Sequence, residues 1–221
     1  MNFAKRFFII LFLLPGPLCA LTPTEEVIQK VQATYEKAQD VSSQFVQKVK
    51  IASLEKEVEK IGKALFKKPG MFKVDYGDDS EGRVYLSNGK KLWVYDKGDT
   101  QVQVYPVSSK TIPEEALSFL GGLGNLRAQF KVNPLNEKEL QATKANSQLD
   151  WLLLTPKNPE SQLDELLLGF ERKGYTVSEA YLKNETGNVS HYIFDQVKLN
   201  SDLKESDFSF AKTKGVKEVL H

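Results

Sequence analysis

The most constraining feature of this chain is a long series of short segments in which apolar side chains alternate with polar ones. The series begins near Ser43, and turn signals such as Asn88-Gly89 and Lys97-Gly98 separate its members. A period of two is typical of a β-strand that buries one face, and Asn-Gly between such runs indicates a hairpin. The pattern predicts an antiparallel sheet of about eleven strands. The predicted strands cover residues 44–51, 57–68, 71–76, 82–87, 91–96, 100–106, 129–135, 149–156, 163–172, 175–183 and 188–200.

The stretch before the first predicted strand has the period of a helix. Residues 22–39 place Val27, Val31 and Tyr35 near one stripe, and a capping box precedes that stripe. A proline at the first helical position also favours a helix start. We therefore expect an amphipathic helix of about four turns that lies on the sheet.

A second stretch that departs from the alternation lies in the middle of the chain. Residues 114–130, "EEALSFLGGLGNLRAQF", are apolar but contain three glycines, at 121, 122 and 124. Each glycine costs a helix about 1 kcal/mol relative to alanine. The segment therefore predicts two short, weakly held helices, and the whole chain predicts a mainly β (α+β) fold with three short helices.

The first twenty residues have the composition of a secretory signal peptide. Two basic residues precede the apolar run 7–14, which is too short to span a bilayer, and the small residue Ala20 ends the segment. A lipoprotein signal would require a small residue before Cys19, where Leu18 stands instead. We expect cleavage near Ala20, export to the periplasm and a single domain over residues 21–221. The exported chain then has no cysteine and forms no disulfide.

The sequence lacks the motifs that commonly carry enzyme chemistry. No HExxH, CxxC, GxSxG or P-loop pattern occurs, and one of the two histidines, His191, lies in a predicted strand. A lone histidine in a strand is more often a packing or surface residue than a catalyst. Without the leader, 28 of the 30 basic residues remain against 29 acidic ones, a net charge of −1, whereas nucleic-acid binding requires a basic face. We expect no enzyme activity, cofactor, metal or nucleic-acid partner.

A single sheet of this size must curl, because its strands twist. The concave side of such a sheet is apolar here, and three short helices can hardly fill it as densely as an ordinary core. We therefore predict an apolar cavity under a helical lid, with a normally packed α+β core as the alternative. The predicted cavity wall consists of Phe66, Phe72, Val74, Tyr76, Tyr85, Trp93 and Tyr95.

Several segments, taken in order, resemble the LolA/LolB lipoprotein-localisation family. They are "GKALFKKPGMFKVDY", "YLSNGKKLWVYD", "TQVQVYPV", "LLLTPK" and "FSFAKTKGV", and the resemblance covers nearly the whole exported chain. It implies an unclosed antiparallel half-barrel with a lid of three helices. The family's receptor, LolB, carries a protruding apolar loop, but the corresponding "GDDSEG" is short and acidic here. This difference favours the carrier.

The resemblance also implies a function and a set of partners. A carrier of this family takes acylated lipoproteins from an inner-membrane ABC transporter, shields their acyl chains and delivers them to an outer-membrane receptor of the LolB type. We expect the same role for this chain, as a monomer. The predicted lid residues are Val31, Tyr35, Leu117, Phe119, Leu120, Leu123 and Leu126.

One position departs from the family pattern. The family has an arginine before the strand-turn proline, and that arginine holds the lid by hydrogen bonds to its backbone, whereas this chain has Lys68. Lysine offers three donors on a flexible stem instead of a planar fork of five, so we expect a weaker latch or none. Two other function classes stay open. One is a periplasmic lipid-sensing or adaptor half-barrel that regulates a membrane partner, and the other is an enzyme that depends on His191.

Overall fold

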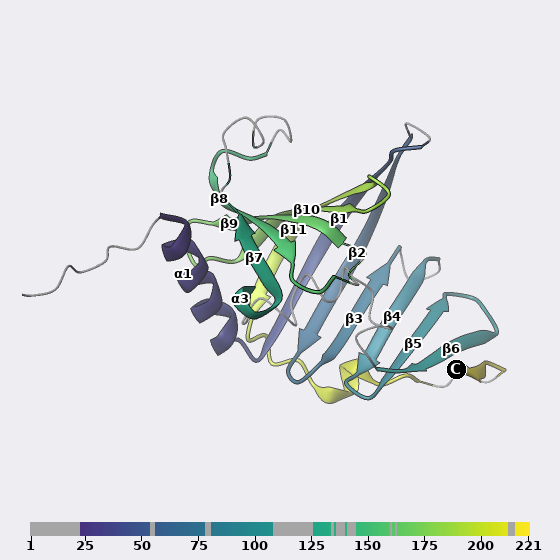
Figure 1. Cartoon of the computed structure of the whole chain (residues 1–221). Coiled ribbons are helices and arrows are strands. Elements are labelled where there is room, and N and C mark those ends of the chain that lie inside the picture. The colour runs from purple at the N-terminus through teal and green to yellow at the C-terminus, as the bar shows by residue number, and fades with distance from the viewer. Residues whose placement is uncertain are drawn as a thin grey trace, which may run out of the picture.

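The described residues form one continuous twelve-stranded sheet with both α-helices on one side (Figure 1). The computed structural model describes residues 23–53, 56–77, 81–107, 126–133, 135, 140, 145–159, 161, 163–211 and 215–221. The strands are β1 (Asp40–Ile51), β2 (Lys56–Lys67), β3 (Met71–Tyr76), β4 (Arg83–Asn88), β5 (Lys91–Asp96), β6 (Gln101–Pro106), β7 (Phe130–Asn133), β8 (Leu149–Pro156), β9 (Leu163–Glu171), β10 (Val177–Asn184), β11 (Val189–Leu199) and β12 (Lys217–Leu220). The helices are α1 (Pro23–Lys37), α3 (Leu126–Gln129) and the 3-10 helix η3 (Glu205–Phe208).

The strands lie in the order β12-β6-β5-β4-β3-β2-β1-β11-β10-β9-β8-β7. Each pair is antiparallel except β6 and β12, which run parallel. β7 and β12 form the two edges, so the curled sheet stays open. The long β1–β2 hairpin extends beyond the other strands, as Figure 1 shows.

The predicted class, a mainly β fold with one unclosed sheet, is confirmed. Eleven strands were expected, and the twelfth is β12, a four-residue strand at the end of the chain that is too short to show a period. The predicted lid of three helices is not confirmed. The described residues contain two α-helices, α1 and α3, while residues 108–125, where most of the glycine-rich segment lies, are outside them.

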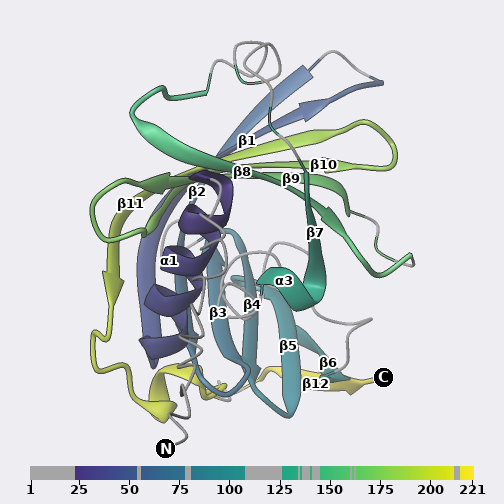
Figure 2. The same cartoon turned by 60° about the vertical axis from the view of Figure 1, so that its left-hand side comes forward.

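Helix α1 lies on the concave side of the curled sheet, together with α3 (Figure 2). Its buried residues are Ile28, Val31 and Tyr35, whose spacing of three and four places them on one face. Two acidic residues in the first turn and Lys37 in the last complement the helix dipole. Among the described residues, no helix combines the length and the apolar character that a transmembrane span requires.

The two faces of the sheet bury separate groups of apolar side chains. The concave face and α1 share one large core, which we call the concave core. On the convex face, a smaller group around Trp93 and Phe208 lies under the chain segment that follows β11. Another convex group contains Trp151 and Leu153 of β8. In these regions the sheet therefore buries apolar side chains on both of its faces.

Candidate functional site

The concave face of β2, β3 and β4 contains five of the seven predicted wall residues. Phe66 and Phe72 are directly opposite each other on neighbouring strands, and their rings stack at 6.3 Å between centroids. Val74 lies opposite Tyr85, and the Tyr85 ring meets the Tyr76 ring edge-on at 6.3 Å. Phe66, Phe72 and Val74 are buried in the concave core, and the two tyrosines pack against it. These strands therefore present one continuous aromatic surface to the inside of the curl.

Trp93 and Tyr95 were predicted to belong to the same wall, and that prediction is wrong. Tyr85 pairs with Val94, and Leu86 pairs with Trp93, so Trp93 and Tyr95 point to the convex face. Trp93 stacks on Phe210 of the C-terminal segment at 6.0 Å between centroids. The segment "LWVY" has apolar residues on both faces, so its alternation could not indicate which set faces inward.

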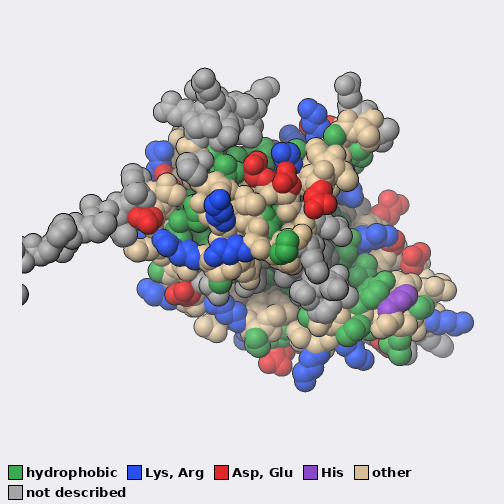
Figure 3. All heavy atoms as spheres, viewed as in Figure 1, with side chains coloured by type: hydrophobic (Ala, Val, Ile, Leu, Met, Phe, Trp, Pro, Cys, Tyr) green, Lys and Arg blue, Asp and Glu red, His purple; other side chains and the backbone are tan. Residues whose placement is uncertain are grey.

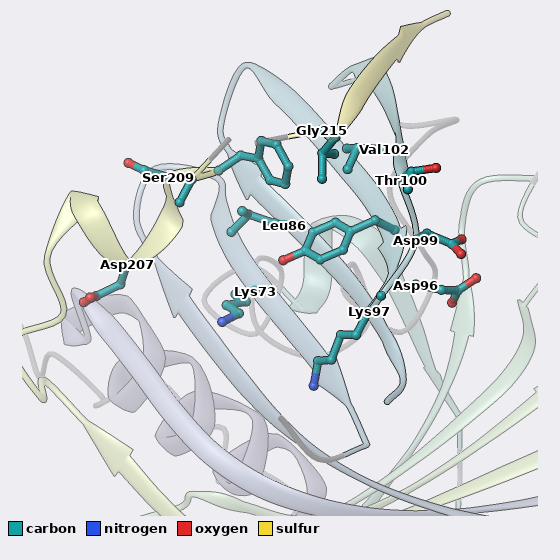
Figure 4. A pocket seen from close by; sticks show the side chains of 15 residues that line it. Lys73, Leu86, Asp96, Lys97, Asp99, Thr100, Val102, Asp207, Ser209 and Gly215 are labelled. Atoms are coloured by element: carbon teal, nitrogen blue, oxygen red, sulfur yellow. The ribbon is translucent and has the colours of Figure 1, made fainter. Parts of the chain in front are cut away.

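A pocket of about 620 Å³ lies beside Tyr95 on the convex face (Figure 4). Its apolar lining includes Leu86, Val102 and Phe210, and Lys73 and Lys97 extend toward its polar side. Both ammonium groups pair with the Asp75 carboxylate, at 3.3 Å from Lys73 and 2.6 Å from Lys97. Burial, and secondly the Asp75 charge, raise the pKa of Tyr95. This pocket is on the opposite side of the sheet from the predicted acyl site.

The predicted lid residues fall into two sets. Val31, Tyr35 and Leu126 are buried in the concave core, on α1 and α3. The Tyr35 hydroxyl accepts a hydrogen bond of 2.9 Å from the backbone N–H of Val177, and burial raises the pKa of this tyrosine. Thr34 donates to the carbonyl of Gly174 at 3.2 Å, so α1 is attached to the β9–β10 turn region. The remaining predicted lid residues, Leu117, Phe119, Leu120 and Leu123, lie outside the described residues.

Lys68 contacts the end of α1. Its Nζ donates to the backbone carbonyls of Tyr35 and Glu36 at 2.8 and 2.9 Å. The last carbonyls of a helix have no partner within the helix, and a cation there also complements the helix dipole. A lysine at this position therefore makes two hydrogen bonds to the helix that covers the concave face.

The prediction missed the half of the concave core that β8, β9, β10 and β11 contribute. This half contains a set of leucines and three aromatic side chains: Leu152, Leu154, Leu166, Leu168, Phe170, Leu182, Tyr192 and Phe194. The runs "WLLL" and "LLLGF" that contain some of them show no alternation, because the convex faces of β8 and β9 are also buried. Their uninterrupted apolar character was the available signal.

His191 lies outside the concave core, beside Glu179 and Tyr181 of β10. Its Nε2 is 3.0 Å from the Glu179 carboxylate, and its ring stacks on Tyr181 at 3.9 Å between centroids. Burial, followed by the Glu179 carboxylate, raises the pKa of Tyr181 to about 12. No group of three or more His, Cys, Asp or Glu side chains that could hold a metal occurs within the described ranges.

Charged groups of both signs are interspersed over the face of the molecule seen in Figure 3. Lysine and arginine side chains alternate there with aspartate and glutamate, and apolar atoms appear between them. This face lacks, over the described residues, the concentration of basic side chains that a nucleic-acid surface requires.

Comparisons with known proteins find similar sequences and a similar fold. A sequence model of the family described as "Outer membrane lipoprotein carrier protein LolA" matches residues 36–211. An outer-membrane lipoprotein carrier protein of Azotobacter vinelandii is 29% identical over 92% of this chain and 94% of its own. Another of Methylobacillus flagellatus is 27% identical over 87% of this chain and 88% of its own. The solved structure of an uncharacterized conserved protein from Thermus thermophilus has a TM-score of 0.53 at 13% identity, covering 90% of this chain and 100% of its own, which supports the fold alone.

Proposed function

This chain belongs to the LolA family of outer membrane lipoprotein carrier proteins, and from that premise we propose that it is a periplasmic lipoprotein carrier. It receives lipoproteins released from the inner membrane, shields their acyl chains against its concave face and delivers them to an outer-membrane receptor. The observation that carries the proposal, beside family membership, is the concave core, because its apolar surface extends across β1–β5 and β8–β11 beneath α1.

A carrier of acyl chains must bind them without retaining them. Each buried CH₂ contributes about 0.8 kcal/mol, so two or three long chains that are fully buried would be held almost irreversibly. A helical lid that packs on the sheet when the site is empty lowers this affinity, because its own apolar contacts are lost on loading. Ile28, Val31 and Tyr35 of α1 provide such contacts.

We assign the latch of this lid to Lys68. Its two hydrogen bonds end on the backbone of α1, so they hold the helix without depending on the helix side chains. Opening breaks both bonds, and the freed ammonium and carbonyl groups then take water as their partners. The glycine-rich residues 117–126 complete the proposed lid.

The carrier works between the two membranes. Residues 1–20 direct export and are removed near Ala20, and residues 21–221 act in the periplasm as a monomeric, non-enzymatic domain. Loading comes from the inner-membrane ABC transporter that releases lipoproteins, and unloading occurs at a receptor of the LolB type.

A matched pair of substitutions on β5 tests the proposed site. Val94 and Tyr95 are neighbours and both half-buried, but Val94 packs against the concave core and Tyr95 lies in the convex pocket. We expect the exported protein to co-purify with acylated polypeptides identified by mass spectrometry. Val94→Glu should lose this cargo, because a carboxylate on the concave face opposes hydrocarbon binding, whereas Tyr95→Glu should retain it.

Circular dichroism establishes that both variants are folded before the cargo is compared. Absence of acylated polypeptides from the wild-type preparation, or equal cargo on folded Val94→Glu and Tyr95→Glu, would contradict the proposed carrier function.

A further inference from the structure

The concave face carries a buried hydroxyl group that lacks a hydrogen bond. Ser43 lies on β1 between Val41 and Phe45, and all three side chains point to the concave side, since alternate residues of a strand share a face. Ser43 is 7% exposed. Within the described part of the chain, its Oγ has no hydrogen-bond partner.

This hydroxyl differs from the other buried polar groups of the site. Gln47, also buried on β1, donates from Nε2 to Ser190 Oγ at 3.3 Å. Apart from Ser43 Oγ, the described residues contain one further buried polar side-chain atom without a hydrogen bond, Asp75 Oδ1, and it lies 2.6 Å from the ammonium of Lys97. A buried polar group without a partner opposes folding, so alanine at position 43 would suit the empty protein better.

The cross-strand neighbour of Ser43 on β2 has a small side chain. Ser43 pairs with Ala64 of β2. The neighbouring Phe45 ring lies over Gly62, where a Cβ atom would come within 2.3 Å of the ring. Opposite Ser43 the register with β11 shifts, and Gln196 there has a positive φ of 52°. A bulge of this kind locally disrupts the ladder and is over-represented beside functional sites.

We infer that the Ser43 hydroxyl is a hydrogen-bond donor for a carbonyl oxygen of the esters that join acyl chains to the cargo; this inference rests on the proposed carrier function. Hydrocarbon chains offer the hydroxyl no partner, but the ester at the head of each chain has an oxygen that can only accept. An ester that enters the concave site loses its hydrogen bonds to water, and Ser43 replaces one of them. The unpaired state of the hydroxyl thus belongs to the empty protein.

Two synthetic lipopeptides that differ only in this linkage test the inference. One carries two hexadecanoyl chains as esters of a glyceryl-cysteine peptide, and the other carries two hexadecyl chains as ethers. Their Kd values for the protein are measured by fluorescence anisotropy of a label on the peptide. We expect the wild type to prefer the ester by about threefold to tenfold, the range that one hydrogen bond supplies. Ser43→Ala should abolish this preference by weakening ester binding and should leave ether binding unchanged.

Ser42→Ala is the matched control, because Ser42 is the preceding residue on β1, points to the other face and pairs with Ser201 Oγ at 3.2 Å. It should keep the wild-type preference. Thermal unfolding should show that Ser43→Ala is at least as stable as the wild type. A preference that persists in Ser43→Ala, or equal binding of the two lipopeptides by the wild type, would overturn the inference alone. Failure of the wild type to bind either lipopeptide would overturn the carrier function as well.

Discussion

At the scale of single residues, the site depends on which face of a strand a side chain occupies. On β5 the order Leu92-Trp93-Val94-Tyr95 offers a large apolar side chain to both faces, and the register with β4 selects Leu92 and Val94 for the concave core. On β1 the same alternation places a small hydroxyl, Ser43, between Val41 and Phe45 on the concave face. A shift of one residue would exchange both sets.

Lys68 gives the clearest prediction at this scale. Lys68→Met keeps an unbranched side chain but removes both hydrogen bonds to the end of α1, which weakens the docking of α1 by about 1 kcal/mol. Hydrogen exchange should therefore become faster in the amides of α1, while the amides of β8–β10 keep their protection. Lys68→Arg should restore slow exchange, because arginine also donates to carbonyl groups. Unchanged exchange in Lys68→Met would show that Lys68 does not hold the helix.

At the scale of elements, the number of buried faces determines whether the sequence of a strand alternates between apolar and polar residues. β3 alternates because its concave side chains lie in the core, while on the other face Lys73 lines the convex pocket and pairs with Asp75. β8 and β9 read as continuous apolar runs because α1 covers one face and a second apolar group covers the other. β12 is mostly exposed; its backbone pairs with β6, and the Trp93 indole of β5 donates to the Glu218 carboxylate at 3.3 Å.

The position of β12 at the edge predicts the effect of its removal. Deletion of residues 217–221 should leave the fold and cargo binding intact and lower Tm by a few degrees, because few buried side chains are lost. It exposes the edge of β6, and an exposed edge strand pairs readily with another chain. Size-exclusion chromatography with light scattering should therefore detect concentration-dependent dimers.

A lysine on the new edge provides the control for this deletion. Gln103→Lys in the shortened chain should reduce dimer formation, because charge on an edge strand opposes pairing between copies. A shortened chain that stays monomeric at every concentration would show that β12 does not protect β6.

At the scale of the whole molecule, the sheet has two arms, one from β12 to β2 and the other from β11 to β7. The order of strands is continuous from β12 to β7, and β1 connects the arms by pairing with both β2 and β11. Side chains from both arms enter the same concave core. We therefore expect the arms to unfold together, as a single domain does.

Two single-tryptophan variants test this cooperativity. Trp93 is buried on β5 in one arm, and Trp151 is buried on β8 in the other. In Trp151→Phe the fluorescence reports only the first arm, and in Trp93→Phe only the second. Within each variant, the fluorescence midpoint in a urea titration should coincide with the far-UV circular dichroism midpoint. Separate midpoints in either variant would show that the arms are independent units.

The local structure of this protein can be predicted from its residues in order. Apolar runs bounded by turn residues predicted β3, β5 and β8 with the bounds that the structure has. In β3 the run alternates, because a strand with one buried face repeats every second residue. Motifs such as "GKALFKKPGMFKVDY" also indicated the family to which the chain belongs.

Which side chains form the site depends on how distant segments pack together. The face taken by Trp93, the contribution of β8–β11 to the concave core and the partner of Lys68 all depend on pairings between distant segments. A period of two fixes which residues share a face, but it does not fix which face turns inward. Register, curvature and the position of α1 supply that information, because they arise from contacts that no single segment contains.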